Sequence, residues 1–170
     1  MGRSEATHKM MKDKRGRNVL FAAAMYGKLH TLKYLVADGL YYEEDNEGNT
    51  PLHIAAKFNH LPVVIYLAVD LEKPCATPNK QGFTPLHYAA YAGSLPIVKF
   101  FKNKGLDMNQ KTNSGFNCLH LACKKGHLEL VQYLIEKAQL NVNEQTFKSK
   151  SSALHFAAEG KHYKVVENLL

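Results

Sequence analysis

The chain has 170 residues, 45% of them hydrophobic, and a formal net charge of +7. This is enough apolar material for one domain with a substantial buried core, so a second fold is not needed. No apolar run approaches the roughly 18 residues of a membrane span, and the charged N-terminus lacks the hydrophobic segment of a signal peptide, so neither membrane insertion nor secretion is predicted.

The first 17 residues are predicted to form a basic tail, flexible or partly helical. They carry six Lys or Arg residues against two acidic ones, and Met10 and Met11 are almost their only large apolar residues. Because a segment without apolar periodicity offers little to a core, the folded domain is expected at residues 18–170.

A four-residue motif then recurs along the chain. Its copies are Asn18-Val19-Leu20-Phe21, Thr50-Pro51-Leu52-His53, Thr84-Pro85-Leu86-His87, Asn117-Cys118-Leu119-His120 and Ser152-Ala153-Leu154-His155. The five leucines are 32, 34, 33 and 35 residues apart, and a fixed period in this range is typical of stacked repeats. The polar first residue can cap a helix and proline is tolerated in the first turn, so each motif predicts the start of a helix.

Each of these helices is predicted to end where a left-handed backbone is favoured. The residues at this turn are Gly27, Asn59, Gly93, Gly126 and Lys161, and glycine, then asparagine, adopts that conformation most readily. A second run with helical apolar spacing follows every turn, for example Ile97, Val98 and Phe101. The repeating unit is therefore a helix, a turn and a second helix.

The recurring Thr-Pro-Leu-His, Ala-Ala and Gly-His elements, with a Val-Val or Ile-Val pair in the second helix, resemble ankyrin repeats over residues 18–170. The resemblance implies an all-α solenoid of stacked helix-turn-helix pairs joined by hairpin loops. About five repeats are expected, near 18–45, 46–78, 79–111, 112–146 and 147–170, the last incomplete. Phe21 in place of histidine and Lys150 in place of the hairpin glycine depart from the pattern.

Two irregularities are expected. Lys73 and Pro74 should end the second helix of repeat two early and lengthen its loop. At the other end, the chain stops at Leu170 inside a second helix, without a polar outer face. We expect either that the array continues in a longer protein or that another surface covers this end.

The histidines and cysteines, which could in principle bind metal or react, are predicted to have structural roles. His53, His87, His120 and His155 occur once per repeat, about 10 Å apart in such a stack, which is too far for shared metal ligation. The resemblance implies that each ties its helix start to the neighbouring loop, and His60 and His127 are interpreted likewise. Cys118 and Cys123 lack zinc-site spacing and a second pair. No phosphate-binding loop or nucleophile elbow is present, so we expect no catalysis, cofactor or metal.

The resemblance further implies a concave face, formed by hairpins and first helices, that is free to bind a partner. The predicted partner-binding residues are Tyr26, Phe58, Lys80, Phe83, Tyr91, Phe116, Lys124 and Lys125. Aromatic anchors of this kind dominate the energetics of protein interfaces. The alternative, left open by the sequence, is that several rings fold onto neighbouring hairpins and are half-buried.

The charge is distributed unevenly. Residues 1–17 carry +4 (6 basic, 2 acidic), residues 18–72 carry −4 (3 basic, 7 acidic) and residues 73–170 carry +7 (13 basic, 6 acidic). The basic C-terminal half is expected to attract an acidic protein or peptide. Nucleic acid is not expected, because no recognisable nucleic-acid-binding element accompanies the charge.

These observations predict a non-catalytic, monomeric protein–protein interaction module. The odd number of cysteines favours reduced thiols and a cytoplasmic location, with the nucleus as an alternative. The alternative function is an N-terminal targeting or regulatory domain of a longer enzyme, channel or secreted bacterial effector, the last acting in the host cytosol, whose active part lies beyond Leu170. The resemblance also marks Asn109 as a position where such repeats can be hydroxylated.

Overall fold

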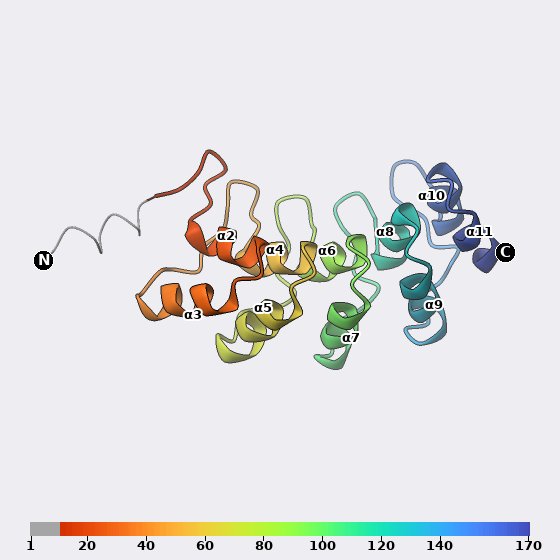
Figure 1. The fold of residues 1–170 in the computed structure, drawn as a ribbon. Helices are drawn as coiled ribbons and strands as arrows, with labels where there is room; N and C mark the ends of the chain where they lie inside the picture. The colour runs from red at the N-terminus through yellow and green to blue at the C-terminus, as the bar shows by residue number, and fades with distance from the viewer. Residues whose placement is uncertain (1–10) are drawn as a thin grey trace, which may run out of the picture.

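The computed structural model describes residues 11–170, and within them the chain forms helices and loops without strands (Figure 1). The predictions made for residues 1–10, most of the basic tail, lie outside the described residues. The first helices are α2 (Val19–Met25), α4 (Pro51–Lys57), α6 (Pro85–Tyr91), α8 (Cys118–Lys125) and α10 (Ala153–Glu159). The second helices are α3 (Leu29–Ala37), α5 (Leu61–Ile65) continued by the π-helix η1 (Tyr66–Asp70), α7 (Leu95–Asn103), α9 (Leu128–Glu136) and α11 (Tyr163–Leu169).

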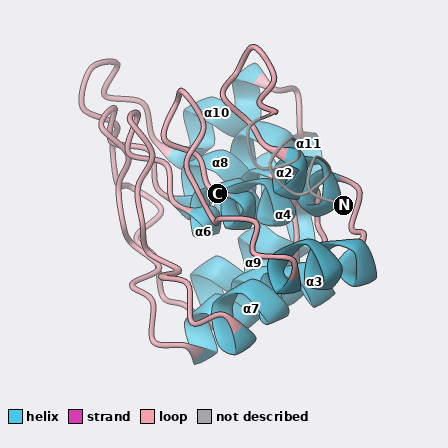
Figure 2. Ribbon diagram, turned by 90° about the vertical axis from the view of Figure 1, so that its left-hand side faces the viewer, coloured by secondary structure: helices cyan, strands magenta, loops and turns pink. Residues whose placement is uncertain are grey.

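The helix pairs stack side by side in chain order, as predicted. First helices pack on first helices, α2 against α4, α4 against α6, α6 against α8 and α8 against α10. Seen along the stack, the first helices form one layer, α3, α7 and α9 lie in a second layer, and the hairpin loops lie to one side (Figure 2). The predicted all-α solenoid of about five repeats is confirmed.

The recurring leucines form the interior of the stack. Leu20, Leu52, Leu86 and Leu119 are at most 1% exposed, with small residues such as Ala89 and Ala90 beside them that let neighbouring helices approach closely. The fifth, Leu154, is only partly buried. It lies on α10, the last first helix, so no further helix covers its other side.

In the four motifs that contain a histidine, the polar first residue caps its helix together with that histidine. The backbone N–H of Thr50 donates to Nδ1 of His53 at 3.0 Å, and the backbone N–H of Asn117 donates to Nδ1 of His120 at 3.1 Å. The side-chain oxygen of Asn117 in turn accepts the N–H of His120 at 3.0 Å. These reciprocal bonds satisfy donors that the first helical turn leaves free, which explains why the helices begin at the motif.

The predicted turn residues all have a left-handed backbone, with φ between 57° and 75°. Above Gly93 lies the ring of His127 from the next repeat, whose Nε2 donates to the carbonyl of Tyr91 at 3.0 Å. His60 and His162 make the same contact with Met25 and Lys124, at 2.8 and 3.2 Å. In the three repeats where a histidine follows the turn, it therefore joins its repeat to the preceding one, as predicted for His60 and His127.

At one turn, both the glycine and the histidine of this contact are replaced by other residues. The turn residue Asn59 replaces glycine, and the residue above it is Ser94, whose hydroxyl donates to the Asn59 side chain. A histidine ring has no room over a residue with a side chain, because a Cβ added at Gly93 would lie 2.5 Å from Nδ1 of His127. The smaller serine accommodates the asparagine.

The expected early break of the second helix in repeat two is wrong. The helix runs through α5 and η1 to Asp70, ten residues in place of the nine in α3, α7 and α9. The Leu52–Leu86 interval is one residue longer than the Leu86–Leu119 interval. A π-turn widens a helix to take up one extra residue, so the insertion is absorbed inside the helix before Pro74 is reached.

The hairpin loops form a connected row. The backbone N–H of Lys80 donates to the carbonyl of Glu47 at 3.0 Å, and that of Asn113 donates to Gln81 at 3.1 Å. The row begins with a hairpin at residues 13–17, closed by a bond from the N–H of Asp13 to the carbonyl of Arg17 at 2.9 Å. This hairpin lies inside the segment that the sequence predicts as a tail; its Asp-x-x-Gly pattern matches that of residues 45–48.

Candidate functional site

Three of the predicted aromatic anchors lie near the ends of first helices in successive repeats. Tyr26 and Phe58 directly precede their turn residues, whereas Tyr91 stands one position earlier, as the last residue of α6. Tyr26, Phe58 and Tyr91 are found where α2, α4 and α6 end, and they are 67%, 44% and 36% exposed. We call the surface formed by these helix ends and the hairpin loops the hairpin–helix surface. It includes Lys124 and Lys125 at the end of α8 and Lys80, Phe83 and Phe116 on the hairpins.

The other two predicted aromatic residues pack onto the domain. Phe83 is partly buried, with its ring 5.5 Å from that of Tyr88, and Phe116 is partly buried, with its ring 5.1 Å from that of Phe156. Each follows a hairpin glycine and precedes a helix cap, so its ring rests on first helices. Of the predicted partner-binding rings, Tyr26, Phe58 and Tyr91 are therefore exposed near helix ends, whereas Phe83 and Phe116 fold onto the domain, as the alternative expected for several of them.

Two rings that support this surface were missed from the sequence: Tyr88, which is partly buried, and Phe156, which is buried against Phe116. Each directly follows the motif histidine, where the other repeats have Ala22, Ile54 and Leu121. An aromatic residue at that position is the signal that could have found them.

The lysines of the hairpin–helix surface lie over the aromatic rings. Nζ of Lys57 is 5.3 Å from the ring centre of Tyr88, and Nζ of Lys125 is 4.5 Å from that of Tyr91. Lys124 lies over both Phe116 and Phe156, at 5.6 and 5.8 Å. Ammonium groups over ring faces are held there by about 0.5–1 kcal/mol at exposed sites, so these charges have preferred positions.

Lys80 acts differently, because its Nζ donates to the carbonyl of Asn46 at 2.8 Å. Lys80 therefore braces two neighbouring hairpins while its charge stays in solvent.

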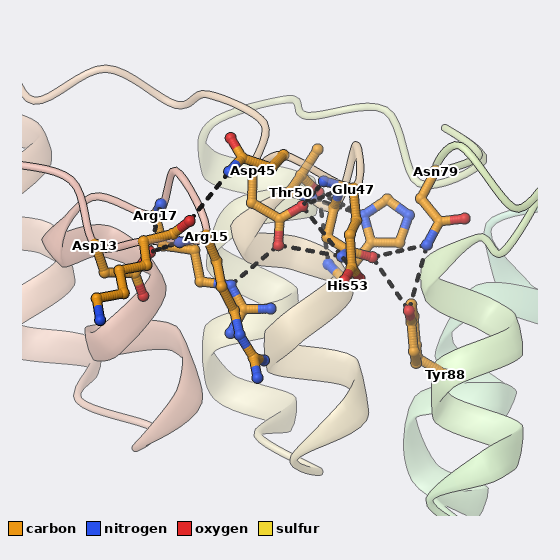
Figure 3. A network of polar contacts seen from close by, with 12 residues as sticks. Asp13, Arg15, Arg17, Asp45, Glu47, Thr50, His53, Asn79 and Tyr88 are labelled. Carbon is orange, nitrogen blue, oxygen red and sulfur yellow. Dashed lines mark hydrogen bonds and ion pairs between the residues drawn. The ribbon is translucent and has the colours of Figure 1, made fainter.

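A chain of polar contacts fixes the first three hairpins relative to one another (Figure 3). Nε of Arg17 is 3.0 Å from Oδ2 of Asp45, whose Oδ1 accepts the backbone N–H of Asn49 at 2.8 Å. The Asn49 side-chain oxygen accepts from Nδ2 of Asn79 at 2.8 Å and from the Tyr88 hydroxyl at 3.1 Å. Burial would raise the pKa of the Asp45 carboxyl, but the donors from Asn49 and Arg17 outweigh it and hold that pKa below its ordinary value.

The motif histidines tie each helix start to the next hairpin region, as the resemblance implied. Nε2 donates to a carbonyl, that of Phe83 for His53, Gln110 for His87 and Glu144 for His120, at 3.0, 3.0 and 2.8 Å. Nδ1 accepts a backbone N–H, so the rings are neutral in the fold. Burial lowers the pKa of all three rings, that of His53 to about 4. His155, in the last repeat, keeps only the cap contact with Ser152.

We expect acidification to destabilise the domain through these rings. In the unfolded chain these histidines bind a proton below about pH 6.5, whereas His53 in the fold does so only near pH 4. The free energy of unfolding therefore decreases as the pH falls from 6.5 towards 4. Each proton that the unfolded chain binds and the fold does not lowers the free energy of unfolding by about 1.4 kcal/mol per pH unit. Urea unfolding at intervals between pH 7.5 and 5 measures the slope. His53→Gln should make the slope shallower, and a slope equal to that of the unsubstituted protein would contradict the assignment.

Residues 11–170 contain no group of three or more His, Cys, Asp or Glu side chains arranged to hold a metal ion. Cys118 and Cys123 are buried, free thiols, and burial raises the pKa of each to about 12, so neither is poised as a nucleophile. Among the described residues, the helices are also too short or too polar to cross a membrane.

Two sequence models of one family match the chain. The model described as "Ankyrin repeats (3 copies)" matches residues 4–77 and 93–170, and that described as "Ankyrin repeats (many copies)" matches residues 69–101. The chain belongs to the ankyrin repeat family. The hairpins, first helices and second helices described above are thus the parts of ankyrin repeats.

Curated relatives are partial matches to proteins of varied kinds. Rabankyrin-5 of Mus musculus is 30% identical over 158 residues, which cover 91% of this chain and 13% of rabankyrin-5. The probable 26S proteasome regulatory subunit p28 of Saccharomyces cerevisiae is 33% identical over 135 residues, 76% of this chain and 58% of the subunit. Protein ACCELERATED CELL DEATH 6 of Arabidopsis thaliana is 41% identical over 70 residues, 41% of this chain and 10% of that protein. The chain therefore spans less than two thirds of each relative.

The two classes of aromatic residue in these ankyrin repeats should separate in a stability measurement. Phe116→Ala should lower the free energy of unfolding by about 1–3 kcal/mol, because it removes a half-buried ring that packs on Phe156. Tyr26→Ala should change it by at most about 0.5 kcal/mol, since that ring is largely in solvent. Chemical denaturation of the two variants measures both changes. A similar loss of free energy of unfolding in the two variants would contradict the assignment of exposed and packed rings.

Proposed function

We propose that this chain is a non-catalytic protein-interaction module that binds a protein or peptide partner on its hairpin–helix surface. Ankyrin repeats generally bind proteins, and one relative bears the name probable 26S proteasome regulatory subunit p28. The observation that carries the proposal is the row formed by Tyr26, Phe58 and Tyr91. Rings left exposed near the first-helix ends of three successive repeats offer a partner large apolar contacts at little cost in side-chain ordering.

The surface is also rigid before a partner arrives. Backbone bonds join each hairpin to the next, and the contacts between Asp45, Asn49 and Asn79 fix the hairpins of repeats two and three. A preordered surface loses little conformational entropy on docking, so more of the contact energy appears as affinity.

A second role is compatible with the first. The matched region is 13% of rabankyrin-5 and 10% of ACCELERATED CELL DEATH 6, so in those relatives the corresponding repeats are one part of a much longer protein. We propose as the alternative that these repeats serve as the targeting or regulatory domain of a longer enzyme, channel or secreted bacterial effector. The full-length reading frame distinguishes this alternative from a free-standing module.

The proposal is tested by removing the exposed rings. In affinity purification from a cell lysate, we expect Tyr26→Ser/Phe58→Ser/Tyr91→Ser to reduce recovery of the captured protein at least about tenfold, since each anchor is worth more than about 1 kcal/mol in a typical interface. The matched control, Tyr34→Ser/Tyr163→Ser, removes rings that are 70% and 74% exposed on second helices. Undiminished capture by the triple variant, or equal loss in the control, would refute the proposal.

A further inference from the structure

On the hairpin–helix surface, one position of the repeat forms a column in which cationic and apolar side chains alternate before an acidic one. It is formed by the residue two places before each turn residue, namely Met25, Lys57, Tyr91, Lys124 and Glu159. All five are exposed or partly buried. They are equivalent positions on packed neighbouring helices, so successive members are about 10 Å apart. The centre of the column therefore presents a cation, an aromatic ring and a second cation at regular intervals.

The two cations are held in place but not neutralised by the protein. Lys57 and Lys124 lie over rings of the following repeat, those of Tyr88 and Phe156. The ion pairs of residues 11–170 are Lys12–Glu43, Arg17–Asp45 and Lys111–Glu144, so neither lysine has an acidic partner among them. Both ammonium groups are thus available to an anionic ligand.

The spacing of the column matches one backbone conformation of a bound peptide. A polyproline II segment has about three residues per turn and rises about 3.1 Å per residue, so every third side chain lies on one face at intervals of about 9 Å. A β-strand alternates its faces and would present every second side chain instead. A polyproline II segment can therefore place consecutive third residues against consecutive repeats.

We propose, resting on the proposed function, that this column binds an acidic peptide segment in polyproline II conformation, with Asp or Glu at positions i and i+6 and an apolar residue at i+3. The two carboxylates meet Lys57 and Lys124, and the apolar side chain packs on Tyr91. Glu159, one repeat further on, disfavours a third acidic residue at i+9 and so fixes the register. The conformation is already common in unfolded chains, which limits the ordering that binding requires.

Single-stranded nucleic acid is the rival ligand for a surface with cations and aromatic rings, because bases stack on exposed rings. Here Tyr91 is the single aromatic member of the column, while Phe156 is buried and Tyr88 is partly buried. Successive bases therefore have no row of exposed rings in the column on which to stack, and Glu159 repels a continuing phosphate backbone. The arrangement favours separate carboxylates at a fixed spacing.

The test uses fluorescence anisotropy with labelled peptides at low salt, about 50 mM, where such charge pairs are least screened. The probe contains Glu-Pro-Ser-Leu-Pro-Ser-Glu, and the control peptide has the same composition in the order Glu-Pro-Ser-Pro-Glu-Ser-Leu. We expect the probe to bind at least about tenfold more tightly than the control peptide. Lys57→Glu and Lys124→Glu should each weaken it about tenfold or more. The double variant should regain binding to a peptide with Lys in place of both Glu residues.

The matched protein control is Lys99→Glu/Lys164→Glu, which makes the same change in net charge on second helices and should retain binding. Equal affinity for the two peptides, or an equal loss in this control, would overturn the inference. So would a labelled oligonucleotide that binds through Lys57 and Lys124 where the probe does not. If the probe fails while capture of a protein still depends on Tyr26, Phe58 and Tyr91, the proposed function stands and this inference falls.

Discussion

Replacing Leu86 with alanine is expected to lower the free energy of unfolding by about 2–5 kcal/mol. Leu86 is fully buried on α6, which packs between α4 and α8 in the middle of the stack. Truncation there leaves a cavity with helices on both sides that cannot collapse without parting the repeats. Chemical denaturation followed by circular dichroism measures the loss.

Leu154→Ala provides the matched control, because the same motif position in the last repeat is only partly buried. Its cost should be about 1 kcal/mol or less, since solvent already reaches the side chain and little cavity can form. A similar loss in the two variants would show that burial between repeats is not what makes this leucine important. A stable Leu86→Ala protein would contradict the packing of the inner layer.

Gly93→Asn is expected to destabilise the domain by about 2–3 kcal/mol, although asparagine tolerates the left-handed backbone at this turn. The reason is a collision, because a Cβ at residue 93 would lie 2.5 Å from Nδ1 of His127 and must displace that ring from its bond to the Tyr91 carbonyl. Gly105→Asn is the control with φ +80° and no atom within 4 Å of the added Cβ, and it should cost less than about 1 kcal/mol.

A second substitution should repair the first. Adding His127→Ser to Gly93→Asn copies the natural Asn59–Ser94 pair, in which the small hydroxyl side chain contacts the asparagine. The double variant should regain at least about 1 kcal/mol relative to Gly93→Asn alone, a coupling that independent sites would not show. Strictly additive effects would mean that the glycine and the histidine above it do not constrain each other.

The elements that repeat in the sequence could be predicted because one physical requirement recurs at each copy. Thr50, Thr84 and Asn117 each cap the helix of their own motif, and each turn residue needs a left-handed backbone. Leu52 and Leu86 both fill the shared interior of the stack. When a requirement is repeated at a fixed period, a single weak signal becomes a strong one. The histidine ties followed from the resemblance and are confirmed for His53, His87 and His120.

The features that occur once could not be predicted in the same way. A proline after the helix suggested an early break in repeat two, whereas the structure absorbs one extra residue in the π-helix η1. Three of the five residues in the hairpin at 13–17 are basic, and the place of this hairpin in the row depends on a bond from the backbone N–H of Asn46, in the next hairpin, to the carbonyl of Arg15. The composition of residues 13–17 alone does not indicate that they pair with Asn46, so the hairpin could not be predicted from this segment.

The candidate surface was predicted in its location but not in its detail. Sequence placed five aromatic residues on one face, but it could not distinguish Tyr26 and Phe58, which project from helix ends, from Phe83, which folds onto Tyr88. The difference depends on whether a neighbouring repeat supplies a ring to pack against. Tyr88 and Phe156 were overlooked because they follow the motif histidine, inside the first helix, whereas the partner-binding face was predicted from hairpin residues and helix ends.

The central claim is that a partner binds across the hairpin–helix surface, and hydrogen exchange of the domain with and without a saturating captured partner tests it most directly. We predict slower amide exchange in residues 45–58, 79–93 and 112–126, which hold the second, third and fourth hairpins and their first helices, with no change in α7 and α9. Protection confined to α7 and α9, with the hairpins and first-helix ends unaffected, would contradict the account.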